Sequence, residues 1–185
     1  MAERVCPWWL GYFLASPMRR WLEKPEEILA PYLREGMTVL EPGPGMGFFT
    51  LPMARMVGST GRVIAVDIQT KMLQSLRRRA LKAGISDRIE TRLAQPNSLG
   101  IGDLEGKVDF VLAFAVVHEL PSPETFFIEA AAALKPGARL LFAEPAGHVK
   151  PAKFQTELDA ALDAGLELTA QPAVRRSIAA VLRKA

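Results

Sequence analysis

The sequence predicts an α/β fold: a doubly wound, mostly parallel, seven-stranded sheet with helices on both faces and an antiparallel last strand. Three observations predict it. Apolar runs of strand length alternate with helical patterns from residue 38 onward. A glycine-rich turn joins the first of these strands to its helix. The connection between the last two apolar runs is too short for a crossover helix, so these two strands should run antiparallel to each other.

The expected elements follow in order along the chain. A helix over residues 25–35 opens with Pro25 in its first turn, is kinked or split at Pro31 and stops at Gly36. Helices are then expected from the glycine turn to about residue 57, over 70–83, from Ser122 to Pro136-Gly137, and over 151–164. The expected strands span 38–41, 62–67, 88–93, 108–114, 139–143, 166–170 and 177–182.

Local signals support individual elements. The helix over 70–83 places Met72, Leu73, Leu76 and Ala80 on one face. The strand over 108–114 is nearly all apolar, as expected of a central strand buried on both faces. The tripeptide Ser122-Pro123-Glu124 provides an N-cap and the first two helical positions of the following helix.

Composition restricts the class of protein. The chain has 185 residues, 49% hydrophobic and 23% charged, which is typical of one globular domain, and its net charge is +3. The cluster Arg77-Arg78-Arg79 cannot form one stripe, because consecutive helix residues point in different directions, so a nucleic-acid partner is not expected. Cys6 is the single cysteine and fits a reducing, cytoplasmic setting. The apolar run over residues 5–15 is too short to span a membrane and contains Pro7, unlike a signal peptide.

The segment with the clearest chemical meaning is the turn after the first strand, Glu41-Pro-Gly-Pro-Gly-Met-Gly47. Gly43, Gly45 and Gly47 let the backbone turn sharply and approach a ligand. The spacing differs from the Gly-x-Gly-x-x-Gly of dinucleotide sites, because Phe48 occupies the position that would need glycine. Glu41 would repel a pyrophosphate and attract an ammonium group. This turn therefore favours a ligand with a cationic amino-acid tail.

A second acidic residue ends the next strand. Asp67 lies 67 − 47 = 20 residues beyond the last glycine, where a carboxylate can accept both hydroxyls of a ribose. The alternative is a structural role, in which Asp67 caps the helix that begins near Thr70.

These segments resemble the motifs of class I S-adenosylmethionine (SAM) dependent methyltransferases. The glycine turn is similar to their first motif, and Val66-Asp67-Ile68 to their second, acidic one. Residues 108–114 with His118-Glu-Leu120 resemble the fourth motif, and residues 134–144 the strand that closes the cofactor domain. The resemblance runs in the family's order from about residue 25 to the C-terminus, so residues 25–185 are expected to form the SAM-binding domain.

The resemblance implies roles for several residues. The turn from Gly43 to Gly47, with Glu41, would hold the methionine moiety of SAM and Asp67 its ribose, with Ile68 and Phe114 beside the cofactor. The family commonly has an acidic residue after the third strand to bind the adenine amino group. Here Gln95 stands in that segment, where it is either an adenine ligand through its side-chain carbonyl or an ordinary loop residue.

His118 is the candidate general base. It follows the central strand at the rim where ligands bind, and histidine titrates near neutral pH. The alternative is a structural histidine. His148 follows the fifth strand on the same rim, so His118, Glu119, Glu144 and His148 could converge; a metal site there is conceivable, but their spacing matches no compact metal motif.

The first residues are expected to act as a separate segment. Trp8, Trp9, Tyr12, Phe13 and Trp21 lie in it. In small members of the family that this chain resembles, a segment before the first helix folds over the site as a lid, so the resemblance implies that residues 1–24 are such a lid. Aromatic faces suit this role, because they attract a sulfonium cation and exclude water. The alternative is that these rings cover an exposed edge or pack between subunits.

The resemblance therefore implies methyl transfer from SAM to a small-molecule acceptor. Two alternatives remain. An RNA or protein methyltransferase would usually need a further recognition domain or a basic aromatic groove. A non-catalytic SAM-binding protein would use the fold alone. Dependence of activity on His118 separates catalysis from binding, and salt-sensitive retention on RNA would favour a nucleic-acid substrate.

Overall fold

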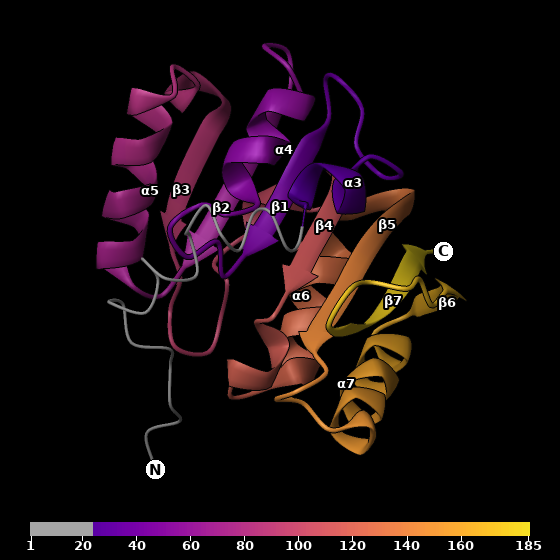
Figure 1. The fold of residues 1–185 in the computed structure, drawn as a ribbon. Coiled ribbons are helices and arrows are strands. Elements are labelled where there is room, and N and C mark those ends of the chain that lie inside the picture. The colour runs from indigo at the N-terminus through magenta and orange to yellow at the C-terminus, as the bar shows by residue number, and fades with distance from the viewer. Residues whose placement is uncertain (1–23) are drawn as a thin grey trace. The chain divides into compact units, whose positions relative to one another are not determined.

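The computed structural model describes residues 24–185. These residues form two compact units, the first ending at Ala94 and the second running from Gln95 to the C-terminus. Figure 1 shows the strands and helices of both units. The predictions for the aromatic leader and Cys6 concern residues outside the described part.

The first unit is built on three parallel strands. In chain order it contains helix α3 (Pro25–Leu29), β1 (Thr38–Pro42), α4 (Thr50–Met56), β2 (Arg62–Asp67), α5 (Thr70–Lys82) and β3 (Ile89–Leu93). The strand order is β3-β2-β1, and Glu41 pairs with Ala65 while Asp67 pairs with Leu93. The carboxyl ends of these strands therefore lie side by side.

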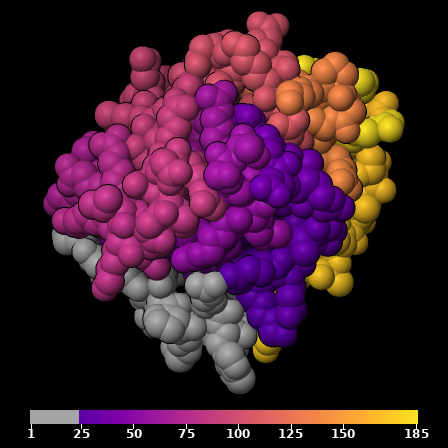
Figure 2. Space-filling view, turned by 90° about the horizontal axis from the view of Figure 1, so that it is seen from above, coloured from indigo at the N-terminus to yellow at the C-terminus, as the bar shows by residue number. Residues whose placement is uncertain are grey.

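The core of the first unit follows the predicted periodicity. Helix α5 buries Met72, Leu73, Leu76 and Ala80, the four residues that the sequence pattern placed on one face. Its other face carries exposed charged residues and forms part of the magenta surface at the left of Figure 2. The burial of this apolar stripe fixes α5 against the strands, and with it the start of the helix next to Asp67.

The second unit contains the remaining four strands. Its elements are β4 (Val108–Phe114), α6 (Pro123–Ala133), β5 (Leu134–Pro145), α7 (Pro151–Asp163), β6 (Leu166–Ala170) and β7 (Ser177–Lys184). Strands β4 and β5 are parallel, and β7 runs antiparallel to both β5 and β6. The predicted fold class is confirmed: the seven strands form a mixed, mostly parallel sheet flanked by helices, with antiparallel strands at the end.

Aromatic packing holds the helices of the second unit in place. Phe142 of β5 packs edge-on against Phe127 of α6, with ring centroids 5.4 Å apart. Phe154 of α7 stacks on the same Phe142 ring, with ring centroids 4.6 Å apart. Aromatic pairs add to the stabilisation that comes from burial. This cluster therefore places the first turns of α7 against β5, the strand that carries Glu144.

Two predicted boundaries are wrong. The helix expected over 25–35 ends at Leu29, because Pro31 has no backbone N–H and cannot continue the helical hydrogen bonds beyond Ala30. The fifth strand, expected over 139–143, begins at Leu134. Pro136-Gly137 therefore lies inside this strand instead of closing α6. The register of β4 and β5 shifts between Val108 and Phe110, and proline and glycine are tolerated at such irregularities.

Among residues 24–185, no helix is both long and apolar enough to cross a membrane.

The predicted N-cap of α6 is present and can be tested. The hydroxyl of Ser122 accepts a hydrogen bond from the backbone N–H of Thr125 at 3.1 Å. We expect Ser122→Ala to lower the free energy of unfolding by about 1 kcal/mol, because this N–H loses its partner. Ser122→Asp should retain most of the stability. Urea denaturation of the three proteins checks this, and equal stability of the alanine and aspartate variants would contradict the assignment.

Candidate functional site

The glycine turn of the first unit has the backbone shape that the sequence predicted. Gly43, Gly45 and Gly47 all have positive φ angles, 67°, 53° and 90°. The turn begins by pairing with the neighbouring strand, since the N–H of Gly43 donates to the carbonyl of Val66 at 2.9 Å. Residues with a Cβ atom rarely adopt positive φ angles, which explains why glycine occupies these three positions.

Gly45 and Gly47 have different surroundings. A Cβ atom at Gly47 would lie 2.5 Å from Cδ1 of Leu76, so this glycine allows the turn to pack tightly on α5. A Cβ atom at Gly45 would meet no atom of the described residues within 4 Å. Gly47 is thus explained by packing, whereas no packing contact within the described part of the chain accounts for Gly45.

Glu41 is a buried carboxyl at the end of β1. It is 4% exposed, and its Oε2 accepts a hydrogen bond of 2.5 Å from the hydroxyl of Thr50 in α4. Burial raises the pKa of Glu41 to about 8; the Thr50 hydrogen bond lowers it and the charge of Asp67 raises it further. A buried carboxyl with this pKa is protonated at neutral pH, and a cation placed beside it would favour the ionised form.

Asp67 lies at the end of the adjacent strand and is 8% exposed. Its Oδ1 accepts the backbone N–H of Gln69 at 2.8 Å. The capping role considered from the sequence is therefore present, and it engages one carboxylate oxygen. The next residue, Ile68, is a large apolar side chain that is 44% exposed. Together with the glycine turn, Glu41 and Asp67 form a group of predicted residues that the first unit brings together.

An arginine of α5 supports this group, and the sequence did not reveal it. The guanidinium Nη1 of Arg79 donates a 2.6 Å hydrogen bond to the carbonyl of Met46, inside the glycine turn. The sequence analysis treated Arg77-Arg78-Arg79 as a solvated face. Arg79 contacts a residue 33 positions away, and no local spacing signals such a contact.

The second unit holds the other predicted residues. Gln95 is exposed and begins a tight turn in which its N–H donates to the carbonyl of Ser98 at 3.0 Å. Glu129 of α6 anchors this turn by accepting from the Ser98 hydroxyl and the Leu99 N–H, both at 2.6 Å. Phe114 is half-buried at the end of β4. Gln95 thus lies in a loop that Glu129 anchors, with its side chain at the surface. This position is compatible both with an adenine ligand and with an ordinary loop residue.

His118 sits in a short 3₁₀ turn, η3 (Val117–Glu119), that follows β4. Between the strand and this turn, Ala115 has a φ of 55°. A left-handed conformation costs an alanine roughly 1 kcal/mol. The Ala115 N–H donates to the carbonyl of Ala143 in β5 at 2.8 Å, which holds the bend. Such strained backbone often occurs at functional sites.

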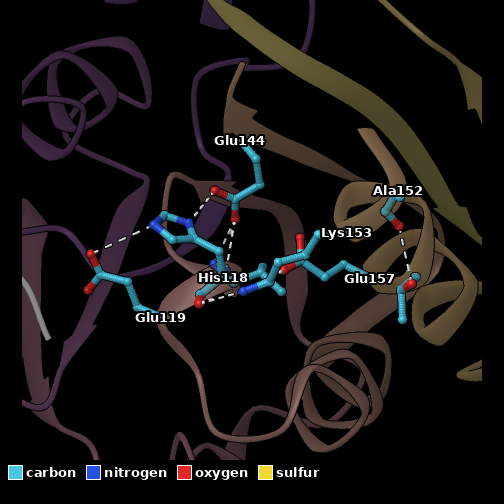
Figure 3. Close-up of polar contacts among 8 residues, drawn as sticks. His118, Glu119, Glu144, Ala152, Lys153 and Glu157 are labelled. Carbon is cyan, nitrogen blue, oxygen red and sulfur yellow. Dashed lines mark hydrogen bonds and ion pairs between the residues drawn. The ribbon is translucent and has the colours of Figure 1, made fainter. Parts of the chain in front are cut away.

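Glu144, at the end of β5, organises the His118 turn (Figure 3). Its carboxylate is fully buried. Its Oε1 accepts the backbone N–H groups of Val117 and His118, at 2.8 and 3.3 Å, and its Oε2 lies 2.5 Å from Nδ1 of the His118 ring. Because a carboxylate only accepts hydrogen bonds, the proton sits on Nδ1, and Nε2 of the neutral ring carries the free lone pair.

The other two residues expected to converge also lie near His118. Its Nε2 is 3.9 Å from Oε1 of Glu119, and its ring packs edge-on against His148 with centroids 5.0 Å apart. Burial lowers the pKa of His118, but the hydrogen bond and charge of Glu144 and the charge of Glu119 raise it, and the net pKa is above its usual value. The pair is therefore a stronger base than a free histidine.

The described residues do not group into a metal site. Within residues 24–185, no set of three or more His, Cys, Asp and Glu side chains has an arrangement that could hold a metal ion. The convergence of His118, Glu119, Glu144 and His148 thus produces hydrogen bonds and a ring contact between these side chains.

Comparison with known proteins identifies similar chains. Residues 33–178 match a family described as a methyltransferase domain. A ubiquinone/menaquinone biosynthesis C-methyltransferase from Enterobacter sp. (strain 638) is 32% identical over 112 residues, which cover 60% of this chain and 44% of that protein. An arsenite methyltransferase from Halobacterium salinarum is 31% identical over 109 residues, covering 59% and 27%. This chain thus spans less than half the length of either curated relative.

A solved structure matches over the full length. The crystal structure of a SAM-dependent methyltransferase from Aquifex aeolicus is similar with a TM-score of 0.86 and 26% sequence identity, and the match covers 98% of this chain and all of that one.

The raised pKa of Glu41 predicts a pH dependence of stability. In the unfolded chain the carboxyl ionises near its ordinary pKa of 4.5, whereas in the folded protein it keeps its proton up to about pH 8. Stability should therefore fall between these two pH values as the unfolded state loses its proton, and level off above pH 8. The total loss is on the order of a few kcal/mol.

Glu41→Gln should remove this loss, because glutamine stays neutral and still accepts the Thr50 hydrogen bond. Urea denaturation from pH 5 to 9 measures it, with the exposed Glu105→Gln as the matched control. If Glu41→Gln follows the wild-type profile, the carboxyl ionises normally in the folded state.

Proposed function

We propose that this chain, which belongs to the class I SAM-dependent methyltransferase family, transfers the methyl group of SAM to a small-molecule acceptor. The observation that carries the proposal is the glycine turn, where no described residue lies close to the Cβ position of Gly45, with a buried carboxyl on each of the two strands beside it. This arrangement suits a ligand that has a cationic tail at one end and hydroxyl groups at the other.

The residues of the first unit fit the two ends of SAM. Glu41 would face the ammonium group of the methionine moiety, which supplies the positive charge that a buried carboxylate needs. Backbone at Gly43 and Gly45 would lie against this moiety. Asp67 would accept the ribose hydroxyls with its carboxylate.

The family resemblance suggests cofactor contacts for three further residues. Ile68 adjoins Asp67 and exposes an apolar side chain that suits one face of the adenine ring. Phe114 is the second apolar candidate. Gln95 would accept a hydrogen bond from the adenine amino group through its side-chain carbonyl, in place of the acidic residue that the family commonly has.

In the proposed mechanism, the chain's main task is to align the acceptor with the methyl group. When bound, SAM supplies a methyl group activated by the sulfonium. Nε2 of His118 accepts the proton that the acceptor loses as it attacks. Glu144 receives the Nδ1–H hydrogen bond, fixes the tautomer and stabilises the imidazolium that forms. The two backbone N–H groups that Glu144 accepts keep its carboxylate in position.

Two observations support a small acceptor that carries a proton. The curated relatives are named for a quinone-biosynthesis C-methyltransferase and an arsenite methyltransferase, and both act on small molecules by those names. A general base formed by a histidine and a buried carboxylate is useful where a proton must leave the attacking atom. A hydroxyl or an acidic C–H group fits this requirement better than an acceptor that is already deprotonated.

Cofactor binding can be tested with S-adenosylhomocysteine and isothermal titration calorimetry. We expect Asp67→Asn to weaken binding about tenfold, or ~1.4 kcal/mol, because the amide accepts hydroxyl hydrogen bonds less strongly than a carboxylate. Asparagine retains an oxygen for the Gln69 N–H, so the fold should persist. The exposed Asp87→Asn is the control. Absence of binding to the wild type, or equal binding by both variants, would refute the assignment of the cofactor site.

Catalysis can be tested with His118→Asn. Once an acceptor screen, read out by S-adenosylhomocysteine formation, identifies a substrate, this variant should lose 10² to 10⁴-fold in kcat, roughly the contribution of a general base. Its affinity for S-adenosylhomocysteine should stay unchanged. His148→Asn, which removes the neighbouring ring, should have a much smaller effect. A His118→Asn variant that turns over normally would exclude the role as base.

A further inference from the structure

Helix α7 brings a lysine against the backbone of the His118 turn. Nζ of Lys153 donates a 3.0 Å hydrogen bond to the carbonyl oxygen of His118, as Figure 3 shows. The same Nζ lies 3.7 Å from Oε1 of Glu157, one helical turn further along α7. Stacking of Phe154 on Phe142 holds this part of the helix on β5. Lys153 is therefore fixed from both sides, by the turn it contacts and by the helix it belongs to.

Glu157, the residue next to this lysine on α7, is unusual because its carboxyl group is buried. It is 2% exposed, and within the described part of the chain neither carboxyl oxygen has a hydrogen-bond partner. Burial and the charge of Glu144 raise the pKa of Glu157, while the charges of Lys153 and His118 lower it. An apolar side chain would be cheaper to bury at this position. Packing alone therefore gives no account of Glu157, whereas the proximity of Lys153 does.

The charges around His118 are unbalanced without Lys153. Glu144 of β5 and Glu119 of η3 both favour the protonated imidazole, and Glu157 of α7 adds a third carboxyl. His148 faces the ring as well. Lys153 is the cation in this group, and its charge lowers the pKa of His118. Without this cation the pKa of His118 would rise further, so a larger share of the imidazole rings would carry the proton that a base must first lose.

We propose that Lys153 is a positioning residue, which Glu157 holds in place, and that it keeps the His118 imidazole available as a neutral base by fixing the η3 turn and opposing the two carboxylates around the ring. The inference rests on the proposed function only in giving His118 a catalytic task. The hydrogen bond and the charge arrangement exist regardless of the acceptor.

The test is an NMR titration of the histidine rings in the full chain without ligand. The chain has two histidines, and His148→Asn assigns the remaining signal to His118. We expect Lys153→Met to raise the pKa of His118, because the opposing charge is gone. Lys153→Arg should keep it near the wild-type value. Lys150→Met, which removes an exposed lysine three residues earlier, is the matched control and should not shift the pKa.

Salt gives a second readout, since the Lys153 side chain is half exposed. The difference between wild type and Lys153→Met should shrink in 0.5 M NaCl, at roughly the screening expected of a partly exposed charge. In turnover assays, the acid limb of the pH–rate profile of Lys153→Met should move to higher pH by the same shift. If Lys153→Met does not fold, Lys153→Gln is titrated in its place.

An unchanged or lowered pKa of His118 in the Lys153 variants would overturn the inference. This outcome is independent of the proposed function, which fails instead if S-adenosylhomocysteine does not bind or if His118→Asn turns over normally.

Discussion

Buried carboxylates at strand ends are the constraint on which the rest of this structure depends. Glu41, Asp67 and Glu144 each stand at the last or next-to-last position of a strand, and none is more than 8% exposed. A carboxyl removed from water is costly unless hydrogen-bond donors lie nearby. Each finds them in a following segment: the Thr50 hydroxyl for Glu41, the Gln69 N–H for Asp67, and the η3 backbone and His118 ring for Glu144. The hydrogen bonds that these carboxyl groups accept thus fix the segments that follow the strands.

The same constraint separates two kinds of chemistry. In the first unit, burial is the main cost of ionising Glu41, and the charge of Asp67 adds to it. A cation beside Glu41 would offset this cost. In the second unit, the carboxylate of Glu144 already accepts hydrogen bonds from two backbone N–H groups and from the His118 ring. Under the proposed function, the first group would receive the ligand, while the second holds the His118 side chain in place.

Elements with a strong local signal could be predicted from the sequence. Strands β2 and β4 have the expected bounds, because runs of apolar residues between turn residues mark them clearly. The glycine turn, Asp67 and His118 could be singled out because each stands at the end of a predicted strand or shortly after it. Strand β5 could not be bounded, because its first residues are fixed by pairing with β4 across an irregular register, against the local signal of Pro136-Gly137. Arg79 and Lys153 were missed because their contacts lie 33 and 35 residues away.

The bend at Ala115 has a consequence for any attempt to transplant this site. An alanine with a φ of 55° is not in its preferred conformation, so the peptide from β4 to the histidine would relax if it were grafted alone onto another scaffold. What keeps the bend is the hydrogen bond from Ala115 to the carbonyl of Ala143, one residue before Glu144 on the next strand. The smallest portable unit is therefore the pair of strands with both of their ends, since the second strand supplies the clamp as well as the carboxylate.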